Sequence, residues 1–330
     1  MAGRFLVTGG AGYVGSHLVA ALLARGDACT VLDNFCTGHR AAVLPGAELV
    51  EGDLSDRALL DSVLACGPWD AVFHFAARSL VGESMRDPML YFQENAGNGA
   101  RLIDACIRHG VGRFVLSSTA ALFGRPGREP LDETAPVEPG SAYGESKHMI
   151  ERMLLWAERV HGLHSACLRY FNAAGADAEG RLGEDHRPET HLMPLVIDAA
   201  LGRRERIDVF GDNFDTPDGT AIRDYVHVAD LAAAHLLVLE PLRQRSVAYN
   251  LGTGGGNSVL EVIRAVERVS GRRVPMQRVG RRAGDPPVLV ASSRGIAAEL
   301  GWRPRYADLD GIVASALRWR ETHPRGYGEN

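Results

Sequence analysis

The sequence has few of the features that mark secreted, membrane or nucleic-acid-binding proteins. Its 330 residues include only five cysteines, odd in number and scattered without CxxC or mixed Cys/His spacing. Such usage is typical of reduced thiols in a cytosolic protein and gives no metal-binding pattern. The net charge of −5 is spread along the chain and leaves no basic footprint for nucleic acid. We therefore expect a cytoplasmic protein that binds neither metal nor nucleic acid.

Long apolar runs, internal repeats and low-complexity segments are also missing from the sequence. The chain passes from Met1 into a short apolar strand, without a basic leader or cleavage site, so we expect neither export nor a place in a membrane. A hydrophobic content of 45% with 23% charged residues is ordinary for a globular protein. The length predicts two domains.

The N-terminal segment has the pattern strand, glycine turn, helix. An apolar strand over 4–8 stops at three spaced glycines, after which apolar residues recur with helical period from 18 to 23. Such glycines suit a tight turn, close approach of the backbone to a pyrophosphate, and close packing of helix on strand. The pattern predicts dinucleotide binding. The contacts expected from this turn are Gly9, Gly12, Tyr13, Val14 and Gly15.

Acidic residues follow the next two predicted strands. Asp33, followed by Asn34, falls where a carboxylate would accept hydrogen bonds from the adenosine ribose and repel a 2′-phosphate, which favours NAD over NADP. Arg40 lies near enough to keep the NADP alternative open. Asp53, followed by Leu54, suits the adenine amino group, and capping of its own loop is the alternative role.

Strands and helices alternate along the first half of the chain. Strands are expected at 4–8, 29–32, 47–50, 71–75, 114–116 and 165–169, and helices at 58–64, at 91–109 and around residues 143–147. Polar residues gather at the carboxyl ends of these strands, and the small residues Ala76 and Ala77 would let a ligand pass close to the backbone. The sequence therefore predicts an α/β fold with a doubly wound parallel sheet of Rossmann type.

Beyond residue 172 the alternation fails, and loops rich in Gly, Pro, Asp and Arg take over. We expect a Rossmann domain at 1–173 and a smaller, mixed α/β substrate lobe at 174–330. A helix at 229–239 and a strand at 248–252 predict that the chain rejoins the first domain over about 223–252.

The segment 141–147 places a phenol and an ammonium four residues apart at the start of a predicted helix. Tyr143 and Lys147 then share one helical face. A tyrosine ionises at about pH 10. It therefore accepts a proton at neutral pH only if something nearby, such as a fixed cation, favours the phenolate. Lys147 is placed to be that cation. An exposed pair on an amphipathic helix is the alternative for YxxxK taken alone.

Motifs occur along nearly the whole chain: VTGGAGYVGSH at 7–17, DN at 33–34, GDL at 52–54, HFAARSLVGES at 74–84, SST at 117–119, YGESK at 143–147, LRYFNAAGA at 168–176, ETHLMP at 189–194, DGTAIRDYVHV at 218–228, YNLGTG at 249–254 and RRAGD at 281–285. In this order they resemble the UDP-glucose 4-epimerase family of the extended short-chain dehydrogenases/reductases. The glycine turn and YxxxK are shared across that superfamily, whereas the motifs after residue 168 are more specific.

The resemblance implies NAD-dependent epimerisation at C4 of a UDP-hexose, by hydride abstraction, rotation of a 4-keto intermediate and hydride return. Tyr143 would take the proton of the 4-hydroxyl. Lys147 would lower the pKa of the tyrosine and hold the nicotinamide ribose, and Thr119 would bond the 4-oxygen where a serine is usual. Because net redox change is zero, NAD would stay bound. A homodimer through helices in the 90–110 and 145–160 regions is also implied.

The same resemblance assigns further binding residues. Those for the cofactor are Phe75, Ala76, Ala77, Asn95, Ser117, Tyr143, Lys147 and Tyr170. Those for the UDP-sugar are Ser79, Thr119, Tyr143, Phe171, Asn172, His191, Leu192, Phe210, Arg223, Arg282 and Asp285. The two arginines suit a diphosphate because a guanidinium is a planar, bidentate donor; surface salt bridges are the alternative role.

Three further residues depart from the family pattern. Phe123 replaces a tyrosine, and His191 stands where many members have asparagine. Leu289, at a position that helps set tolerance of a C2 substituent, is neither large and aromatic nor small. UDP-N-acetylhexosamines and UDP-pentoses therefore stay open as alternative substrates.

Related proteins offer two further alternatives. Sugar-nucleotide dehydratases have a motif similar to STDEVYG after the strand that corresponds to 114–116. The Asp-Glu pair of that motif supplies the acid and the base for elimination. Here both positions are alanine, Ala120 and Ala121, which disfavours elimination. A non-catalytic NAD-sensing regulator typically loses the Tyr/Lys pair, and this chain has both residues.

Overall fold

The computed structural model describes residues 2–124, 127, 130–282 and 285–328. The chain divides into two compact units. Unit 1 comprises Met1–Gly124, Ala135–Arg169 and Ala232–Tyr249, and unit 2 comprises Arg125–Thr134, Tyr170–Leu231 and Asn250–Asn330. In the described ranges, no helix combines the length and the apolar character that crossing a membrane requires.

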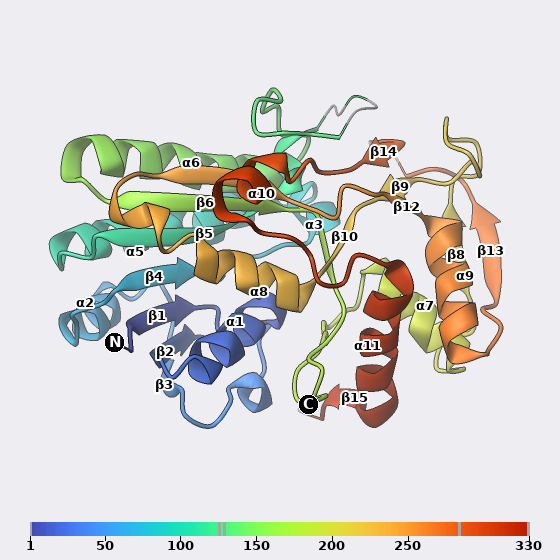
Figure 1. Ribbon diagram of the computed structural model, residues 1–330, viewed down its shortest axis with the longest axis horizontal. Helices are drawn as coiled ribbons and strands as arrows, with labels where there is room; N and C mark the ends of the chain where they lie inside the picture. Colours follow the sequence, from blue (N-terminus) through green and yellow to red (C-terminus); the bar gives the residue numbers. More distant parts are fainter. Residues whose placement is uncertain (1, 125–126, 128–129, 283–284, 329–330) are drawn as a thin grey trace. The chain divides into compact units, whose positions relative to one another are not determined.

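A seven-stranded sheet forms the centre of the first unit (Figure 1). Its strands are β1 (Arg4–Thr8), β2 (Ala28–Asp33), β3 (Glu48–Glu51), β4 (Ala71–His74), β5 (Arg113–Thr119), β6 (His164–Tyr170) and β11 (Val247–Leu251). The order is β11-β6-β5-β4-β1-β2-β3, and the pairs β1–β2, β1–β4, β2–β3 and β4–β5 are parallel. Since the strand order reverses between β1 and β4, the sheet is doubly wound, and the predicted Rossmann-type fold is confirmed.

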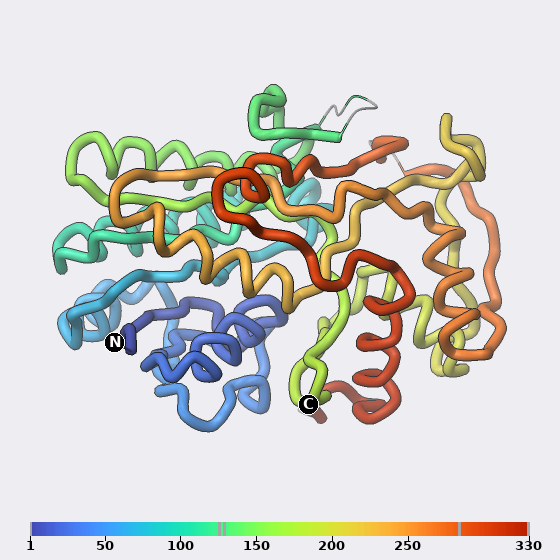
Figure 2. The backbone as a smooth tube through the Cα atoms, in the orientation of Figure 1, coloured from blue at the N-terminus to red at the C-terminus, as the bar shows by residue number. Residues whose placement is uncertain are grey.

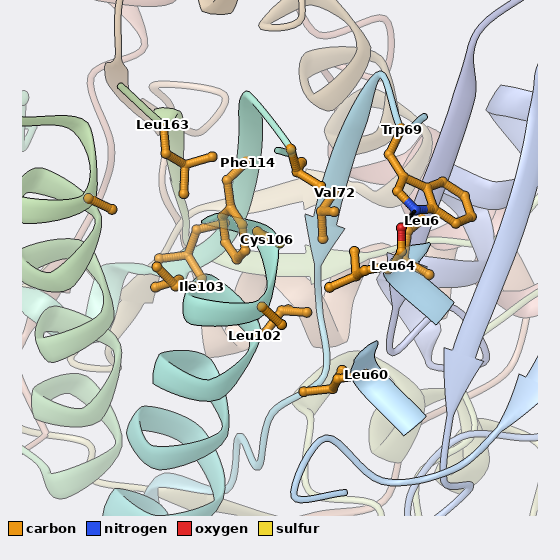
Figure 3. Close-up of a cluster of buried hydrophobic side chains, with 14 of the residues drawn as sticks. Leu6, Leu60, Leu64, Trp69, Val72, Leu102, Ile103, Cys106, Phe114 and Leu163 are labelled. Carbon is orange, nitrogen blue, oxygen red and sulfur yellow. Dashed lines mark hydrogen bonds between the residues drawn. The ribbon is translucent and has the colours of Figure 1, made fainter. Parts of the chain in front are cut away.

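Helices cover the sheet because alternate strand residues point to opposite faces. The helices of this part are α1 (Tyr13–Ala24), α2 (Arg57–Ala65), α3 (Val81–Ser84), α4 (Pro88–Tyr91), α5 (Asn98–Arg108), α6 (Ala142–His161) and α8 (Val228–Leu237). On one face, Val72 of β4 packs in a buried cluster with Leu60, Leu102 and Leu154, which come from α2, α5 and α6. Figure 3 shows Leu102 of this cluster beside the strands. The next residue of β4, Phe73, lies on the other face, 6.4 Å between ring centroids from His235 of α8.

The helix predicted over 91–109 is interrupted. A π-helical turn, η2 (Phe92–Gly97), joins α4 to α5, and the buried residue Asn95 lies within it. A single π turn inside a helix often marks a functional position, because it re-aims the side chains around it. After the turn, α5 packs beside α6 (Figure 2).

Unit 2 is a mixed α/β unit of small sheets. They are β10 (Tyr225–His227) with β7 (Asn172–Ala174); β12 (Asn257–Ser258), β9 (Ile222–Arg223) and β14 (Val288–Leu289); and β13 (Met276–Val279) with β8 (Ile207–Phe210). Its remaining elements are α7 (Leu192–Ala200), α9 (Val259–Ser270), α10 (Arg294–Leu300), α11 (Leu309–Thr322) and β15 (Pro324–Tyr327). Val196, Ile263 and Val313, from α7, α9 and α11, meet in one buried cluster.

Candidate active site

The glycine turn lies at the carboxyl end of β1, where the strand order reverses. Gly9 has a φ of +73°, and a Cβ there would lie 2.3 Å from the backbone nitrogen of Ala76. A Cβ on Gly15 would lie 2.2 Å from the carbonyl oxygen of Gly9, so α1 packs as closely as its backbone allows. No side chain caps α1 at Gly12, and its first turn has no acidic residue. This helix start therefore suits an anion such as a pyrophosphate.

Asp33 ends β2 beside this turn. Its carboxylate is buried and accepts hydrogen bonds from Ala11 N at 3.0 Å and Phe35 N at 2.9 Å. Burial raises the pKa of Asp33, and the two N–H donors and the charge of His39 oppose that rise. A carboxylate accepts about four hydrogen bonds, so Asp33 retains capacity for ribose hydroxyls.

The residues predicted near the adenine are joined to each other. Asn34 Nδ2 donates to Asp53 Oδ2 at 2.5 Å, and Ser55 N donates to Asp53 Oδ1 at 2.8 Å. The second contact is the loop-capping role that the sequence left as the alternative for Asp53. Arg40 is paired with Glu51, and its guanidinium lies 4.4 Å from the ring centroid of Phe35.

Lys147 is buried, with only 2% of its surface exposed. Its Nζ donates to the carbonyl oxygen of Ser117, in β5, at 2.9 Å. Burial lowers the pKa of Lys147 to about 8, against the opposing charge of Glu151. His74 is also buried, and its Nδ1 lies 2.8 Å from Thr8 Oγ1. Burial and the charge of Lys147 lower the pKa of His74 to about 3, so this imidazole is neutral.

Tyr143 lies in the first turn of α6. Ser141 caps this helix by accepting a hydrogen bond from Gly144 N at 3.1 Å. A Cβ on Gly144 would lie 2.3 Å from Ala121 O, so glycine lets the helix start approach the end of β5. There the Thr119 hydroxyl bonds to Tyr143. Burial raises the pKa of Tyr143, and this hydrogen bond lowers it in part.

The predicted effect of Lys147 on Tyr143 stays a prediction. In the chain by itself the net direction of the Tyr143 pKa is upward, and Thr119 supplies the lowering influence. The structure therefore brings Thr119 and Tyr143 together directly, and it places the Lys147 ammonium on the backbone of the same strand end.

Asn95 links the segment after β4 to α6. Its amide nitrogen donates to Arg78 O at 2.9 Å and Ser146 Oγ at 3.0 Å, and its amide oxygen accepts from Arg78 N at 2.8 Å. These contacts hold the 76–80 segment, which also carries Ala77 and the exposed Ser79. The prediction that Asn95 touches the cofactor stays a prediction.

In unit 2, predicted substrate residues form two pairs. Arg223 Nη2 lies 2.7 Å from Asp285 Oδ1, with 14% of the arginine side chain exposed. The Arg282 guanidinium lies 3.8 Å from the ring centroid of Phe210. Ala283 and Gly284 of the RRAGD motif lie outside the described residues. Leu289 pairs in register with Arg223.

The other predicted substrate residues occur near β7 and α7. Tyr170 ends β6, Phe171 is half-buried, and Asn172 begins β7, where its backbone nitrogen donates to Asp224 O at 2.9 Å. Leu192 is the first residue of α7, and His191 precedes it. The imidazole of His191 contacts the carboxylate of Glu184.

Comparisons with known proteins identify the family. The model of the NAD dependent epimerase/dehydratase family, Epimerase, matches residues 5–252. The UDP-glucose 4-epimerase of Streptococcus mutans serotype c is 48% identical over 328 residues, which are 98% of this chain and 98% of that protein. The chain belongs to the NAD dependent epimerase/dehydratase family.

Solved structures of UDP-glucose 4-epimerases are also similar to this chain. The UDP-glucose 4-epimerase from Brucella ovis in complex with NAD has a TM-score of 0.93 at 44% identity, covering 96% of this chain and 98% of that chain. The enzyme from Bifidobacterium longum in complex with NAD+ and UDP has a TM-score of 0.93 at 36% identity, covering 98% and 99%. The predicted resemblance to UDP-glucose 4-epimerases is confirmed.

One buried residue of this epimerase-family chain escaped the sequence analysis. Glu151 follows Lys147 by one helical turn and accepts hydrogen bonds from Ser118 Oγ at 2.6 Å and from Arg169 Nε at 3.0 Å and Nη2 at 2.6 Å. The signal in the sequence was its position four residues after Lys147, which places both side chains on one face of the helix. Its contacts brace the strand end that carries Thr119. Phe123 is buried, and the Arg169 guanidinium lies 6.0 Å from its ring centroid.

Proposed function

We propose that this chain catalyses NAD-dependent epimerisation at C4 between UDP-glucose and UDP-galactose. The observation that carries the proposal is the arrangement of Thr119, Tyr143 and Lys147 at the end of β5 and the start of α6. It occurs in a chain 48% identical to a UDP-glucose 4-epimerase over nearly its full length.

The residues of unit 1 fit NAD. The uncapped start of α1 and the turn glycines, where a Cβ would collide with backbone, suit the pyrophosphate. Asp33 would hold the adenosine ribose, and Asn34 and Asp53 the adenine. When bound, NAD supplies a reversible hydride acceptor for C4 of the sugar. The remaining proposed contacts are Leu54, Phe75, Ala76, Ala77, Asn95, Ser117 and Tyr170.

The protein's own groups handle the proton. Tyr143 Oη accepts the proton of the sugar 4-hydroxyl, and the same oxygen returns it after the sugar has turned over. Thr119 donates to this oxygen and so favours the phenolate. Lys147, held by Ser117 O, supplies a buried positive charge whose field falls on the same strand end.

Residues of unit 2 would hold the UDP portion. We assign Arg223 and Arg282 to the diphosphate, because planar bidentate donors match its oxygens. Asp285 already orients Arg223 and would accept from the ribose. The other proposed contacts to the UDP-sugar are Ser79, Phe171, Asn172, His191, Leu192 and Phe210.

We further propose that the chain forms a homodimer through α6 and the neighbouring α5. Large apolar side chains on α6 are exposed, among them Met149, Trp156 at 60% and Val160 at 64%. Their spacing of seven and four residues places them on one side of the helix. Contiguous apolar surface of this kind marks interaction sites. The five free thiols support a reducing, cytoplasmic setting.

The experiment is to incubate the purified chain with UDP-galactose, without added NAD, and to separate the products by chromatography. We expect a steady mixture of UDP-galactose and UDP-glucose. Tyr143→Phe should fold and keep its NAD but lose about 10²–10⁴-fold in rate. Unchanged UDP-galactose from protein shown to contain NAD would contradict the proposal, and a near wild-type rate in Tyr143→Phe would remove this residue from the mechanism.

A further inference from the structure

Four side chains with metal-ligating groups meet in unit 2, in the segment that precedes α7. Glu184, His186, Glu189 and His191 each offer one ligand atom, and these atoms all lie within 4.8 Å of one another. Nδ1 of His186 is 3.3 Å from Glu184 Oε1 and 3.6 Å from Glu189 Oε1. Nδ1 of His191 contacts the same oxygen of Glu184. The donors thus converge on one point rather than spreading along the surface.

Two of these spacings approach those around a tetrahedral ion. Imidazole nitrogens and carboxylate oxygens lie about 2.0–2.2 Å from zinc, so neighbouring ligands are separated by roughly 3.4 Å. The distances from His186 to Glu184 and Glu189 are close to that value. Small side-chain rotations would place the four donors around one ion.

The carboxylates are held in place by backbone nitrogens of the same segment and by side chains of α11. Glu189 Oε1 accepts hydrogen bonds from the backbone nitrogens of Thr190 and His191, both at 2.9 Å, and its Oε2 lies 3.2 Å from Arg320 Nη2 in α11. Glu184 is buried, and its carbonyl oxygen accepts from Trp319 Nε1 at 3.3 Å. Such supporting bonds orient metal ligands before an ion binds.

Both imidazoles contact the same oxygen of Glu184. The rings of His186 and His191 are edge-on, with centroids 5.0 Å apart. The donor set of two nitrogens and two oxygens suits zinc and similar divalent ions.

We propose that Glu184, His186, Glu189 and His191 bind one divalent transition-metal ion of the zinc class. All four ligands come from the protein, which is the pattern of a structural site rather than a catalytic one. The ion would fix the 184–191 segment against α11 and so fix the start of α7. Because Leu192 follows His191 directly, the site would also pre-order a proposed contact to the UDP-sugar, a consequence that rests on the proposed function.

The test uses the whole chain, stripped with a chelator, supplied with Zn²⁺ or Co²⁺ and dialysed. We expect one zinc per chain by elemental analysis, a higher melting temperature than the stripped protein, and visible ligand-field absorption from tetrahedral Co²⁺. The double variant His186→Gln/His191→Gln should lose all three signals. The matched control, His161→Gln, changes an exposed histidine at the end of α6 and should behave as wild type.

Absence of both stoichiometric metal and a melting shift in the wild-type chain would overturn the proposal, and so would equal binding by the double variant. If the double variant fails to fold, the single variant Glu189→Gln decides: an unchanged Co²⁺ spectrum would overturn the assignment, and a weakened one would support it. Metal content and melting are measured without substrate. Failure of the metal site is therefore distinct from failure of the proposed epimerisation.

Discussion

Hydrogen bonding from the hydroxyl of Thr119, the last residue of β5, lowers the pKa of Tyr143 in the first turn of α6. Thr119 Oγ1 also accepts a hydrogen bond from Ala121 N at 3.1 Å. Burial raises the pKa of Tyr143, and the bond from Thr119 opposes the rise.

Removing the Thr119 hydroxyl should therefore shift the pH dependence of catalysis. Thr119→Val keeps the shape but loses the donor, so we expect turnover to fall by about 10²–10³-fold, as for loss of one preorganised donor. In the proposed mechanism Tyr143 acts as a phenolate, so activity should rise with pH through its pKa, and the rise should move to higher pH in the variant. Thr119→Ser keeps the hydroxyl and is the control. A valine variant with the wild-type pH profile would show that this bond does not tune Tyr143.

Replacing Lys147 should lower activity without lowering stability. Burial lowers the pKa of Lys147 from 10.5 to about 8, so the folded state disfavours the ammonium. That destabilising contribution is full below the folded-state value of about 8 and fades as the pH rises toward 10.5. Lys147→Met should lose most turnover, because it removes the buried positive charge proposed to act on Tyr143. Its free energy of unfolding at neutral pH should be unchanged or higher by up to about 2 kcal/mol, because loss of the donor to Ser117 O offsets part of the gain.

Urea unfolding at neutral pH and at about pH 10 checks this prediction. The gain in free energy of unfolding of Lys147→Met over wild type should shrink at the higher pH. Arg152→Met changes an exposed cation on the same helix and should alter stability by less than about 0.5 kcal/mol. A Lys147→Met chain that is much less stable than wild type at neutral pH would contradict the account.

Cofactor identity tests the role of Asp33. Protein purified without added cofactor should release NAD or NADH on denaturation, because the buried carboxylate repels a 2′-phosphate. Arg40, the residue that could have favoured NADP, is paired with Glu51. Enzymatic assay of the released nucleotide distinguishes the two cofactors. Recovery of NADP alone would refute the ribose argument.

Leu289 should set how well a C2 N-acetyl group is accepted. It lies on β14 in register with Arg223, a proposed diphosphate contact. A side chain of intermediate size predicts weak or intermediate activity on UDP-N-acetylhexosamines. Leu289→Ser should raise the kcat/KM ratio for N-acetylated over plain substrate, and Leu289→Tyr should lower it. Equal wild-type rates on both substrate pairs would show that this position does not select by size.

Local patterns predicted most of the sheet and its ligand-binding edge. The apolar runs and spaced glycines specify β1, the turn and α1, because each constraint acts within a few residues. The strand at 248–252 was predicted to return to the first domain, and β11 indeed lies at the edge of the seven-stranded sheet. Fold class is encoded locally in this chain.

Contacts between distant residues were not predictable in the same way. The π turn around Asn95 is stabilised by hydrogen bonds to Arg78 and Ser146, and no periodicity in 91–109 predicts it. The network of Glu151 with Ser118 and Arg169 joins three elements. The 184–191 cluster was not predicted, because its donors are histidines and glutamates rather than cysteines combined with histidines. Three acids and two histidines in eight residues were the signal.

The most direct test of the central claim is isotopic. UDP-galactose carrying deuterium at C4 is converted by the purified chain in ordinary water, without added NAD, and the product is analysed by mass spectrometry and NMR. We expect UDP-glucose that keeps the deuterium at C4, because the hydrogen removed from the sugar returns to the same carbon. Loss of the label to solvent would contradict hydride return and would place the chemistry in proton exchange instead.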